Sequence, residues 1–131
     1  MLCRSKAKGE EARDEIKKET GNENVHLHVV DISNPDDIES FAITMKKQKE
    51  HDDKNVMPSV LVNNAGCMVN EPEFTPEVLE KNFATNTVGT YLLTELMLPL
   101  MTRPTRIVSV SSGYEHSAYT VLRQFHGFRF P

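Results

Sequence analysis

The stretch Leu61-Val62-Asn63-Asn64-Ala65-Gly66, LVNNAG, decides how the rest of the sequence is interpreted. A short apolar run between Pro58 and Gly66 is typical of a buried strand in a parallel sheet. Two asparagines and a glycine at the end of such a run are unfavourable unless the backbone there approaches another group closely. The segments on either side indicate what that group is.

Helical and extended segments alternate before LVNNAG. Ser5 to Thr20 is rich in helix formers, and Gly21 directly after it is a typical helix stop. Val25 to Ile32 is rich in β-branched residues and has no helical periodicity, so it is predicted to be a strand. The chain therefore begins with a helix followed by a strand.

A second helix is predicted after this strand. Pro35 suits a first helical turn, and either Ser33 or Asn34 is the expected cap. The apolar face of this helix is formed by Ile38, Phe41, Ala42 and Met45. The helix leads into the strand at Ser59 to Asn64.

The longest periodic segment follows LVNNAG. Thr75 is predicted to cap a helix and Pro76 to occupy its first turn. One face of this helix carries Leu79, Phe83, Asn86, Thr90, Leu93, Met97 and Leu100. Thr105 to Gly113 is a further strand with serines near its end. Helices and strands thus alternate along the chain, which predicts an α/β fold with a parallel sheet.

The composition restricts the class of protein. The chain has 131 residues and a formal net charge of -4, so we expect one domain and no nucleic-acid partner. Cys3 and Cys67 are too few for a disulfide scaffold and indicate a reducing compartment such as the cytoplasm. Apolar runs are too short or interrupted for a membrane span. His26 and His28 share one face of a strand without a third ligand nearby, so we expect no metal site.

Polar residues gather where the predicted strands end. They are Asp31, Asn63 to Gly66, and the serines Ser109, Ser111 and Ser112. In an open parallel sheet, ligands bind outside the carboxyl ends of the strands. Taken singly, each residue has a structural alternative, because aspartate and glycine suit turns and serine suits a cap. Together with a polar Asn86 on an apolar helix face, they favour a ligand site.

Four motifs identify a family that this chain resembles. They are DIS at 31–33, NNAG at 63–66, NTVGTYLLT at 86–94 and RIVSVSSG at 106–113. Their order and approximate spacing resemble the short-chain dehydrogenase/reductases. The resemblance extends to about Gly113, and residues 114–131 form a divergent tail. It implies a single partial NAD(P)-binding domain over residues 1–131, a Rossmann-type doubly wound parallel sheet that lacks the first strand, the glycine-rich turn and the last strands.

The resemblance also implies a cofactor site, for NADP(H) or alternatively NAD(H). Asp31 and Ile32 would lie along the adenine ring, and the backbone of Asn64, Ala65 and Gly66 would pack beneath the cofactor. A dinucleotide is therefore what lies against LVNNAG.

Arg4 stands where family members that prefer NADP often carry a basic residue. A guanidinium there would bind the adenosine 2′-phosphate through charge-assisted hydrogen bonds. An ordinary solvated charge near the terminus is the equal alternative.

Two residues match the family's catalytic positions. Asn86 matches the asparagine that holds a water molecule in a proton relay. Ser112 matches the serine that hydrogen-bonds the substrate carbonyl, and Ser111 is the alternative if the alignment shifts by one residue.

The chain departs from the family at both ends. It contains no glycine-rich turn, and its tail has no lysine for the Tyr-x-x-x-Lys pair. Tyr119 and Arg123 have the same spacing, but Tyr119 is too close to Ser112 for us to expect a substitute. Without the family's first strand, the strand at Val25 to Ile32 is expected to be separated from that at Ser59 to Asn64.

The function that follows from the resemblance is an NADP(H)-dependent oxidoreductase that interconverts carbonyl and alcohol groups of a small molecule. The fragment alone is expected to be inactive. The alternative is a non-catalytic interaction module that binds another copy or a longer family member.

Overall fold

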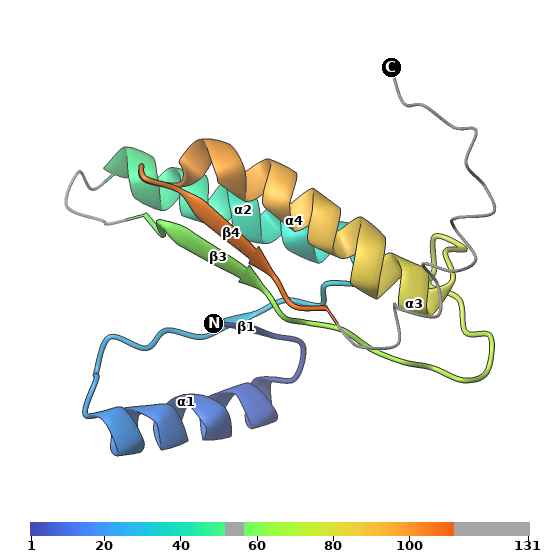
Figure 1. Ribbon diagram of the computed structural model, residues 1–131, viewed down its shortest axis with the longest axis horizontal. Coiled ribbons are helices and arrows are strands. Elements are labelled where there is room, and N and C mark those ends of the chain that lie inside the picture. Colours follow the sequence, from blue (N-terminus) through green and yellow to red (C-terminus); the bar gives the residue numbers. More distant parts are fainter. Residues whose placement is uncertain (52–56, 112–131) are drawn as a thin grey trace.

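The computed structural model describes residues 1–51 and 57–111 of the chain. Figure 1 shows how the helices and strands are arranged. In chain order, the elements are β1 (Leu2–Cys3), α1 (Lys6–Thr20), β2 (His28–Val29), α2 (Pro35–His51), β3 (Val60–Asn63), α3 (Lys81–Phe83), a π-helical segment (Ala84–Gly89), α4 (Thr90–Met97), a 3-10 turn (Leu98–Leu100) and β4 (Arg106–Ser109).

The strands form two separate parallel pairs. Leu2 of β1 lies opposite His28 of β2, and Val60 of β3 lies opposite Arg106 of β4. The expected α/β architecture with parallel strands is therefore confirmed. The expected separation of the two strand regions is confirmed as well, because among the described residues β1 and β2 form one sheet and β3 and β4 another.

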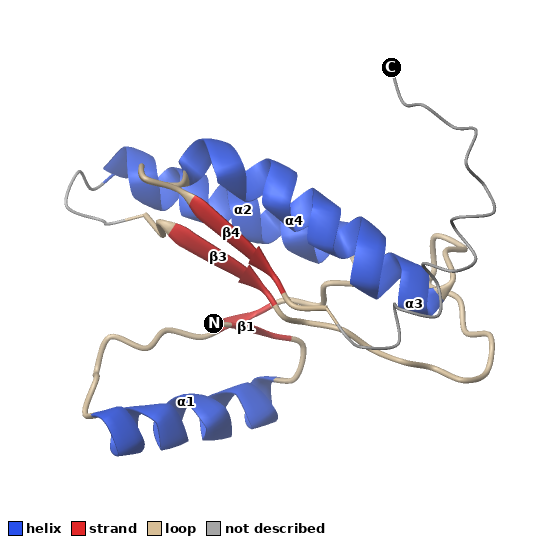
Figure 2. Cartoon of the chain, viewed as in Figure 1, coloured by secondary structure: helices blue, strands red, loops and turns tan. Residues whose placement is uncertain are grey.

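A layer of two helices joins the strand pairs. α2 and α4 lie side by side on the same side of β3 and β4 (Figure 2). The buried core beneath them consists of Val30, Ile32, Ile38, Leu93, Met97 and Leu100. Leu2 of β1 and Leu61 of β3 both pack against this cluster. Apolar packing against the helices thus connects two sheets that share no described strand.

α1 lies on the far side of β1 from α2 and α4 (Figure 1). Its predicted ends are confirmed: the Ser5 hydroxyl oxygen accepts a hydrogen bond from the Lys8 N–H at 3.5 Å, and Gly21 ends the helix with a φ of 67°. Gly9 is the buried residue of α1. A Cβ there would lie 2.7 Å from a methyl carbon of Leu27. The glycine allows the helix to lie close to the segment before β2.

The predicted strand at Val25 to Ile32 is much shorter than expected. Only His28–Val29 forms a strand, because its partner β1 has only two residues. An extended backbone needs a neighbouring strand for its hydrogen bonds, so the ladder stops where β1 stops. The apolar residues beyond it are still used, since Val30 and Ile32 are buried in the core.

Of the two predicted helix starts, the one at Pro35 is confirmed and the one after Thr75 is wrong. α2 begins at Pro35 as expected, and the Asn34 side-chain oxygen accepts a hydrogen bond from the Asp36 N–H at 2.9 Å. The long helix does not begin after Thr75, as predicted, but at Lys81. Val78 has a φ of 63°, which a helix does not allow, so residues 75–80 form a turn before the helix.

The helix layer approaches the backbone of Ile32, shortly after β2, very closely at Gly89. A Cβ on this buried residue would overlap the carbonyl oxygen of Ile32 and would lie 2.8 Å from its Cγ2 atom. Glycine inside a helix costs about 1 kcal/mol relative to alanine, so a packing constraint is needed to explain it. Contact with the Ile32 backbone supplies that constraint.

Gly89→Ala is expected to lower the free energy of unfolding by about 1–3 kcal/mol, because the added methyl group forces the backbones of Ile32 and α4 apart. Urea denaturation followed by circular dichroism measures the change. Gly66→Ala is the matched control, because a Cβ there meets only Asn86 Oδ1, at 3.4 Å. If Gly89→Ala were as stable as the unmodified chain, the close contact with Ile32 would be wrong.

Candidate functional site

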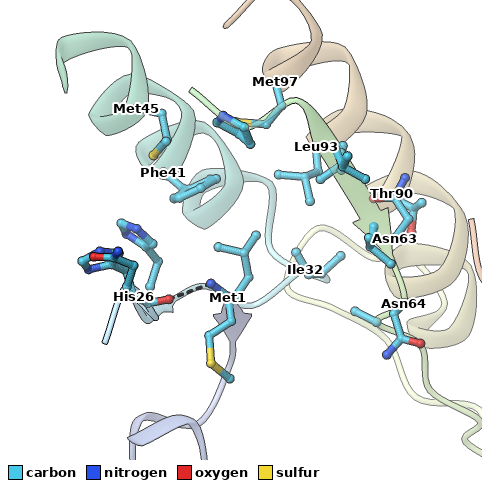
Figure 3. A pocket seen from close by; sticks show the side chains of 18 residues that line it. Met1, His26, Ile32, Phe41, Met45, Asn63, Asn64, Thr90, Leu93 and Met97 are labelled. Atoms are coloured by element: carbon cyan, nitrogen blue, oxygen red, sulfur yellow. Dashed lines mark hydrogen bonds between the residues drawn. The ribbon is translucent and has the colours of Figure 1, made fainter. Parts of the chain in front are cut away.

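A cavity of about 680 Å³ lies between the two strand pairs (Figure 3). Ile32, Asn64 and Ala65 line it at the ends of β2 and β3, and Phe41 and Leu93 line it from the helix layer. Three of the predicted cofactor residues are therefore brought to one place. The strand ends meet there because Ile32 is fixed against Gly89 and β3 packs against the same helices.

Arg4, Asp31 and Gly66 lie at the same strand ends but outside the lining of this cavity. Arg4 follows β1, is exposed, and makes no hydrogen bond or ion pair with another described residue. Its guanidinium is thus available for an anion. Gly66 follows β3 and is exposed, and a Cβ there would have only Asn86 Oδ1 nearby, at 3.4 Å.

Asp31 is already engaged in a local turn. Its Oδ1 atom accepts hydrogen bonds from the Ser33 N–H at 2.9 Å and from the Ser33 hydroxyl at 2.7 Å. Its own N–H donates to the Asp37 carboxylate at 2.9 Å. The turn predicted as the structural alternative is therefore present, and it holds the carboxylate at the end of β2 with its second oxygen unpaired among the described residues.

Asn86 holds the loop after LVNNAG through both atoms of its amide. Its Nδ2 donates to the Cys67 carbonyl oxygen at 2.8 Å, and its Oδ1 accepts from the Cys67 N–H at 2.9 Å. One helical turn earlier, Asn82 does the same to Val69: Nδ2 donates to the carbonyl oxygen at 3.0 Å and Oδ1 accepts from the N–H at 2.7 Å. The side-chain amides of Asn82 and Asn86 thus supply the backbone hydrogen bonds that a neighbouring strand would otherwise supply to this loop.

The start of α3 keeps Asn82 in position. The Glu80 carboxylate accepts hydrogen bonds from the N–H groups of Asn82, at 3.0 Å, and Phe83, at 2.8 Å, and from the Asn82 side chain at 2.8 Å. These bonds stabilise the ionised form, first through the two backbone N–H groups, and lower the pKa of Glu80 below its ordinary value. The capping carboxylate and the asparagine act as one unit.

A change of helical form occurs at Asn86. The π-helical segment Ala84–Gly89 contains it, and α4 begins at Thr90. π-helical turns occur frequently at functional sites, because the added residue changes which main-chain groups are paired. The water-holding role expected of Asn86 stays a prediction, and its side-chain amide is bonded to the Cys67 backbone.

The second predicted catalytic residue is not described. Ser109 ends β4 and Ser111 follows it, close to the end of β3 through the pairing of Asn63 with Ser109. Ser112 lies outside the described residues, as do Tyr119 and Arg123. The structure therefore brings the strand that leads to Ser112 beside NNAG.

The comparisons with known proteins agree with this arrangement. A family model described as short chain dehydrogenase matches residues 1–124. The chain belongs to the short-chain dehydrogenase family. It is similar to dehydrogenase/reductase SDR family member 12 from Homo sapiens, with 46% identity over 116 residues, 86% of this chain and 34% of that protein. It is also 33% identical to retinol dehydrogenase 11 from Homo sapiens over 132 residues, 99% of this chain and 40% of that protein.

A solved structure shares the fold of this short-chain dehydrogenase chain. A metagenomic short-chain oxidoreductase in complex with NADP superimposes with a TM-score of 0.63 at 26% identity, over 94% of this chain and 63% of that chain. The chain spans about a third of the length of the curated relatives that it matches. A Rossmann-type arrangement is therefore established for the part of the family fold that is present.

His28, one of the two histidines considered as metal ligands, packs against an aromatic ring. The His28 ring packs edge-on against Phe41 with ring centroids 5.0 Å apart, and burial lowers its pKa, with the N-terminal ammonium and His26 adding to the effect. Within residues 1–51 and 57–111, no cluster of three His, Cys, Asp or Glu side chains could hold a metal ion. No helix in these ranges is long and apolar enough to cross a membrane.

Sequence reasoning missed Asn82 and Gly89. A glycine in the middle of the periodic segment was a signal for close packing, since glycine is unfavourable in a helix interior. Asn82 gave a weaker signal: it precedes Asn86 by four residues and so shares its helix face. Its loop partner was not predictable, because the path of residues 67–69 depends on tertiary contacts.

We expect Asn82→Ala and Asn86→Ala to release different parts of the loop. Asn82→Ala should speed amide hydrogen exchange at Val69 and leave the Cys67 amide protected. Asn86→Ala should speed exchange at Cys67 and leave the Val69 amide protected. Residue-resolved exchange by NMR measures both.

Each asparagine serves as the control for the other. Asn82→Asp is a further control that keeps an acceptor for the Val69 N–H and loses the donor to its carbonyl. Unchanged exchange at both amides in both alanine variants would contradict the two-asparagine arrangement.

Proposed function

We propose that this chain is the cofactor-binding part of an NADP(H)-dependent oxidoreductase that interconverts carbonyl and alcohol groups of a small molecule. The observation that carries the proposal is the meeting of Ile32 with Asn64 and Ala65 in one cavity at the strand ends. Ligands of open parallel sheets bind at this edge. Membership of the short-chain dehydrogenase family supports the same reaction class.

The residues present fit one part of a dinucleotide. Asn64, Ala65 and Gly66 are exposed, and a Cβ at Gly66 would meet only Asn86 Oδ1, so a flat group can approach their backbone. The unpaired guanidinium of Arg4 suits a 2′-phosphate, and this supports NADP(H) over NAD(H). The free carboxylate oxygen of Asp31 can accept a hydrogen bond from the adenosine.

Asn86 and Ser112 are proposed as the catalytic residues. The main-chain carbonyl of Asn86 would hold a water molecule, while its side chain fixes the Cys67 backbone beside NNAG. Ser112 would donate a hydrogen bond from its hydroxyl to the substrate oxygen, with Ser111 as the alternative. A bound nicotinamide supplies hydride transfer to or from the substrate carbon.

The fragment itself is proposed to be inactive. Its sequence has no Tyr-x-x-x-Lys pair to pass a proton to the substrate oxygen and no glycine-rich turn to bind the pyrophosphate. Cofactor binding should therefore be weak. We further propose a cytoplasmic location, on the basis of two free thiols, and partners that include a second copy or a longer family member.

NADPH added to the ¹⁵N-labelled chain is expected to shift the amide resonances of Arg4, Ile32 and residues 64–66, with a Kd on the order of 1 mM. Arg4→Gln should weaken NADPH binding to the level of NADH and leave NADH binding unchanged, because only NADPH carries the 2′-phosphate. Two-dimensional NMR titrations with both cofactors measure these changes.

Two results would contradict the proposal. Resonance shifts confined to other parts of the chain would place the cofactor elsewhere. Steady oxidation of NADPH by the purified fragment with a panel of aldehydes and ketones would contradict its inactivity, and Ser112→Ala would then test whether the serine is responsible.

A further inference from the structure

Residues 73–81 form a small hairpin that leads into α3 (Figure 1). Phe74 and Glu80 are bridged in the antiparallel sense, and the Lys81 N–H donates to the Glu73 carbonyl oxygen at 2.8 Å. The side chains of Lys81 and Glu73 form an ion pair across the base of the hairpin. The hairpin is therefore a defined structure and not an irregular connection.

Val78 adopts a left-handed conformation in the turn of this hairpin, with a φ of 63°. A β-branched side chain is unfavourable in this region, whereas glycine and asparagine tolerate it. Two hydrogen bonds join Thr75 and Leu79: the Thr75 N–H donates to the Leu79 carbonyl oxygen at 2.8 Å, and the Leu79 N–H donates to the Thr75 hydroxyl oxygen at 3.3 Å. The Val78 N–H donates to the Thr75 carbonyl oxygen at 2.9 Å. The turn thus holds a valine in a conformation that costs free energy.

Burial does not offset this cost, because the Val78 side chain is 77% exposed. Phe74 of the hairpin is 63% exposed, and Met68 is 76% exposed on the loop whose Val69 backbone is bonded to Asn82. Apolar side chains stabilise a fold through the area that folding removes from water, so these three contribute little to it. Exposed apolar side chains that lie near one another indicate contact with another molecule. We name Met68, Phe74 and Val78 the hairpin patch.

The charges around the hairpin patch are mostly negative. Residues 68–83 contain four glutamates and one lysine. Two of the glutamates are engaged within the fold, one in the ion pair with Lys81 and one at the cap of α3. Glu71 and Glu77 are exposed and form no ion pair with another described residue. The free charges beside the patch are therefore both negative, which favours a cationic partner.

We propose that the hairpin patch binds a segment of another protein in which large apolar side chains are flanked by lysine or arginine. The apolar side chains of the partner would remove the patch from water, and its cations would lie near Glu71 and Glu77. This contact explains a strained and exposed valine, because Val78 becomes favourable when the partner covers it. No residue of the patch lines the cavity at the strand ends, so the inference goes beyond the proposed oxidoreductase function.

A basic partner fits better than a second copy of this chain or an anionic membrane. The chain has a formal net charge of -4, and a two-fold contact through the hairpin patch would bring the glutamates of the two copies together. The anionic lipids of a membrane surface would repel Glu71 and Glu77. A cationic segment is instead attracted by both.

The test uses a fluorescein-labelled peptide, KLIKFLKK, whose leucine, isoleucine and phenylalanine side chains supply the apolar contact and whose lysines supply the charge. Fluorescence anisotropy with the full 131-residue chain is expected to show saturable binding at a ratio of one to one. Raising the sodium chloride concentration from about 50 mM to about 500 mM should weaken this binding, because salt screens the attraction. The charge-reversed peptide ELIEFLEE should show no saturable binding.

Val78→Asn separates the effect on binding from the effect on folding. Asparagine tolerates a φ of 63°, so this variant is expected to raise the midpoint of urea unfolding. The same variant should bind the peptide about fivefold more weakly, because the exposed apolar side chain is lost. A purely structural role for Val78 would not give a chain that is more stable and binds less well.

Matched variants on α4 control for general changes of the surface. Tyr91→Ser removes an exposed aromatic side chain from α4, as Phe74→Ser does from the hairpin patch. Glu95→Gln removes an exposed carboxylate from α4, as Glu77→Gln does beside the patch. Phe74→Ser should weaken peptide binding about fivefold and Glu77→Gln about twofold. Neither variant on α4 should change the affinity.

Four results would overturn the proposal. One is the lack of a saturable rise in anisotropy with KLIKFLKK, and another is equal binding of ELIEFLEE. The third is an unchanged affinity or a lowered urea midpoint in Val78→Asn. The fourth is a dimer by light scattering, or binding to vesicles of phosphatidylserine and phosphatidylcholine, that Val78→Asn abolishes, because the patch would then bind a second copy or a membrane. None of these measurements involves NADPH, so they are independent of the proposed oxidoreductase function.

Discussion

The structure depends on the contact between the Gly89 backbone and the Ile32 carbonyl. The two strand pairs share no described strand, so their relative position is set by the helix layer and the residues that touch it. Gly89 lets α4 reach the backbone that follows β2, and Leu61 fixes β3 against the same core. A side chain at Gly89 would move the end of β2 away from the end of β3. Because Gly89 has no side chain, the ends of β2 and β3 stay close enough to line one cavity.

Much of the fold could be predicted because the signals were local. Ser5 and Gly21 bound α1 through a hydroxyl cap and a left-handed φ, both of which depend on one or two residues. The extent of β2 and the start of the long helix could not be predicted in this way. A strand continues only as far as its partner, and β1 is short; the helix start depends on the left-handed Val78, which no local preference indicates.

The candidate site shows the same division between local and distant causes. NNAG and Asn86 were evident from the sequence, because asparagines and glycine are unusual in apolar segments. Their arrangement depends on contacts across the chain: the Asn86 amide is used twice on the Cys67 backbone, and Asn82 repeats this at Val69. Asn86, which is expected to act chemically, is thus also one of two residues that position the loop after NNAG.

The helix layer holds the two strand pairs at a fixed separation through the packing at Gly89 and Leu61. The most direct measurement is pulsed electron paramagnetic resonance between nitroxide labels introduced by Val29→Cys in β2 and Val108→Cys in β4, both exposed positions, with Cys3 and Cys67 replaced by alanine. We expect one narrow distance distribution in native buffer, which broadens when Gly89→Ala is added. A broad distribution in native buffer, before any change at Gly89, would contradict it.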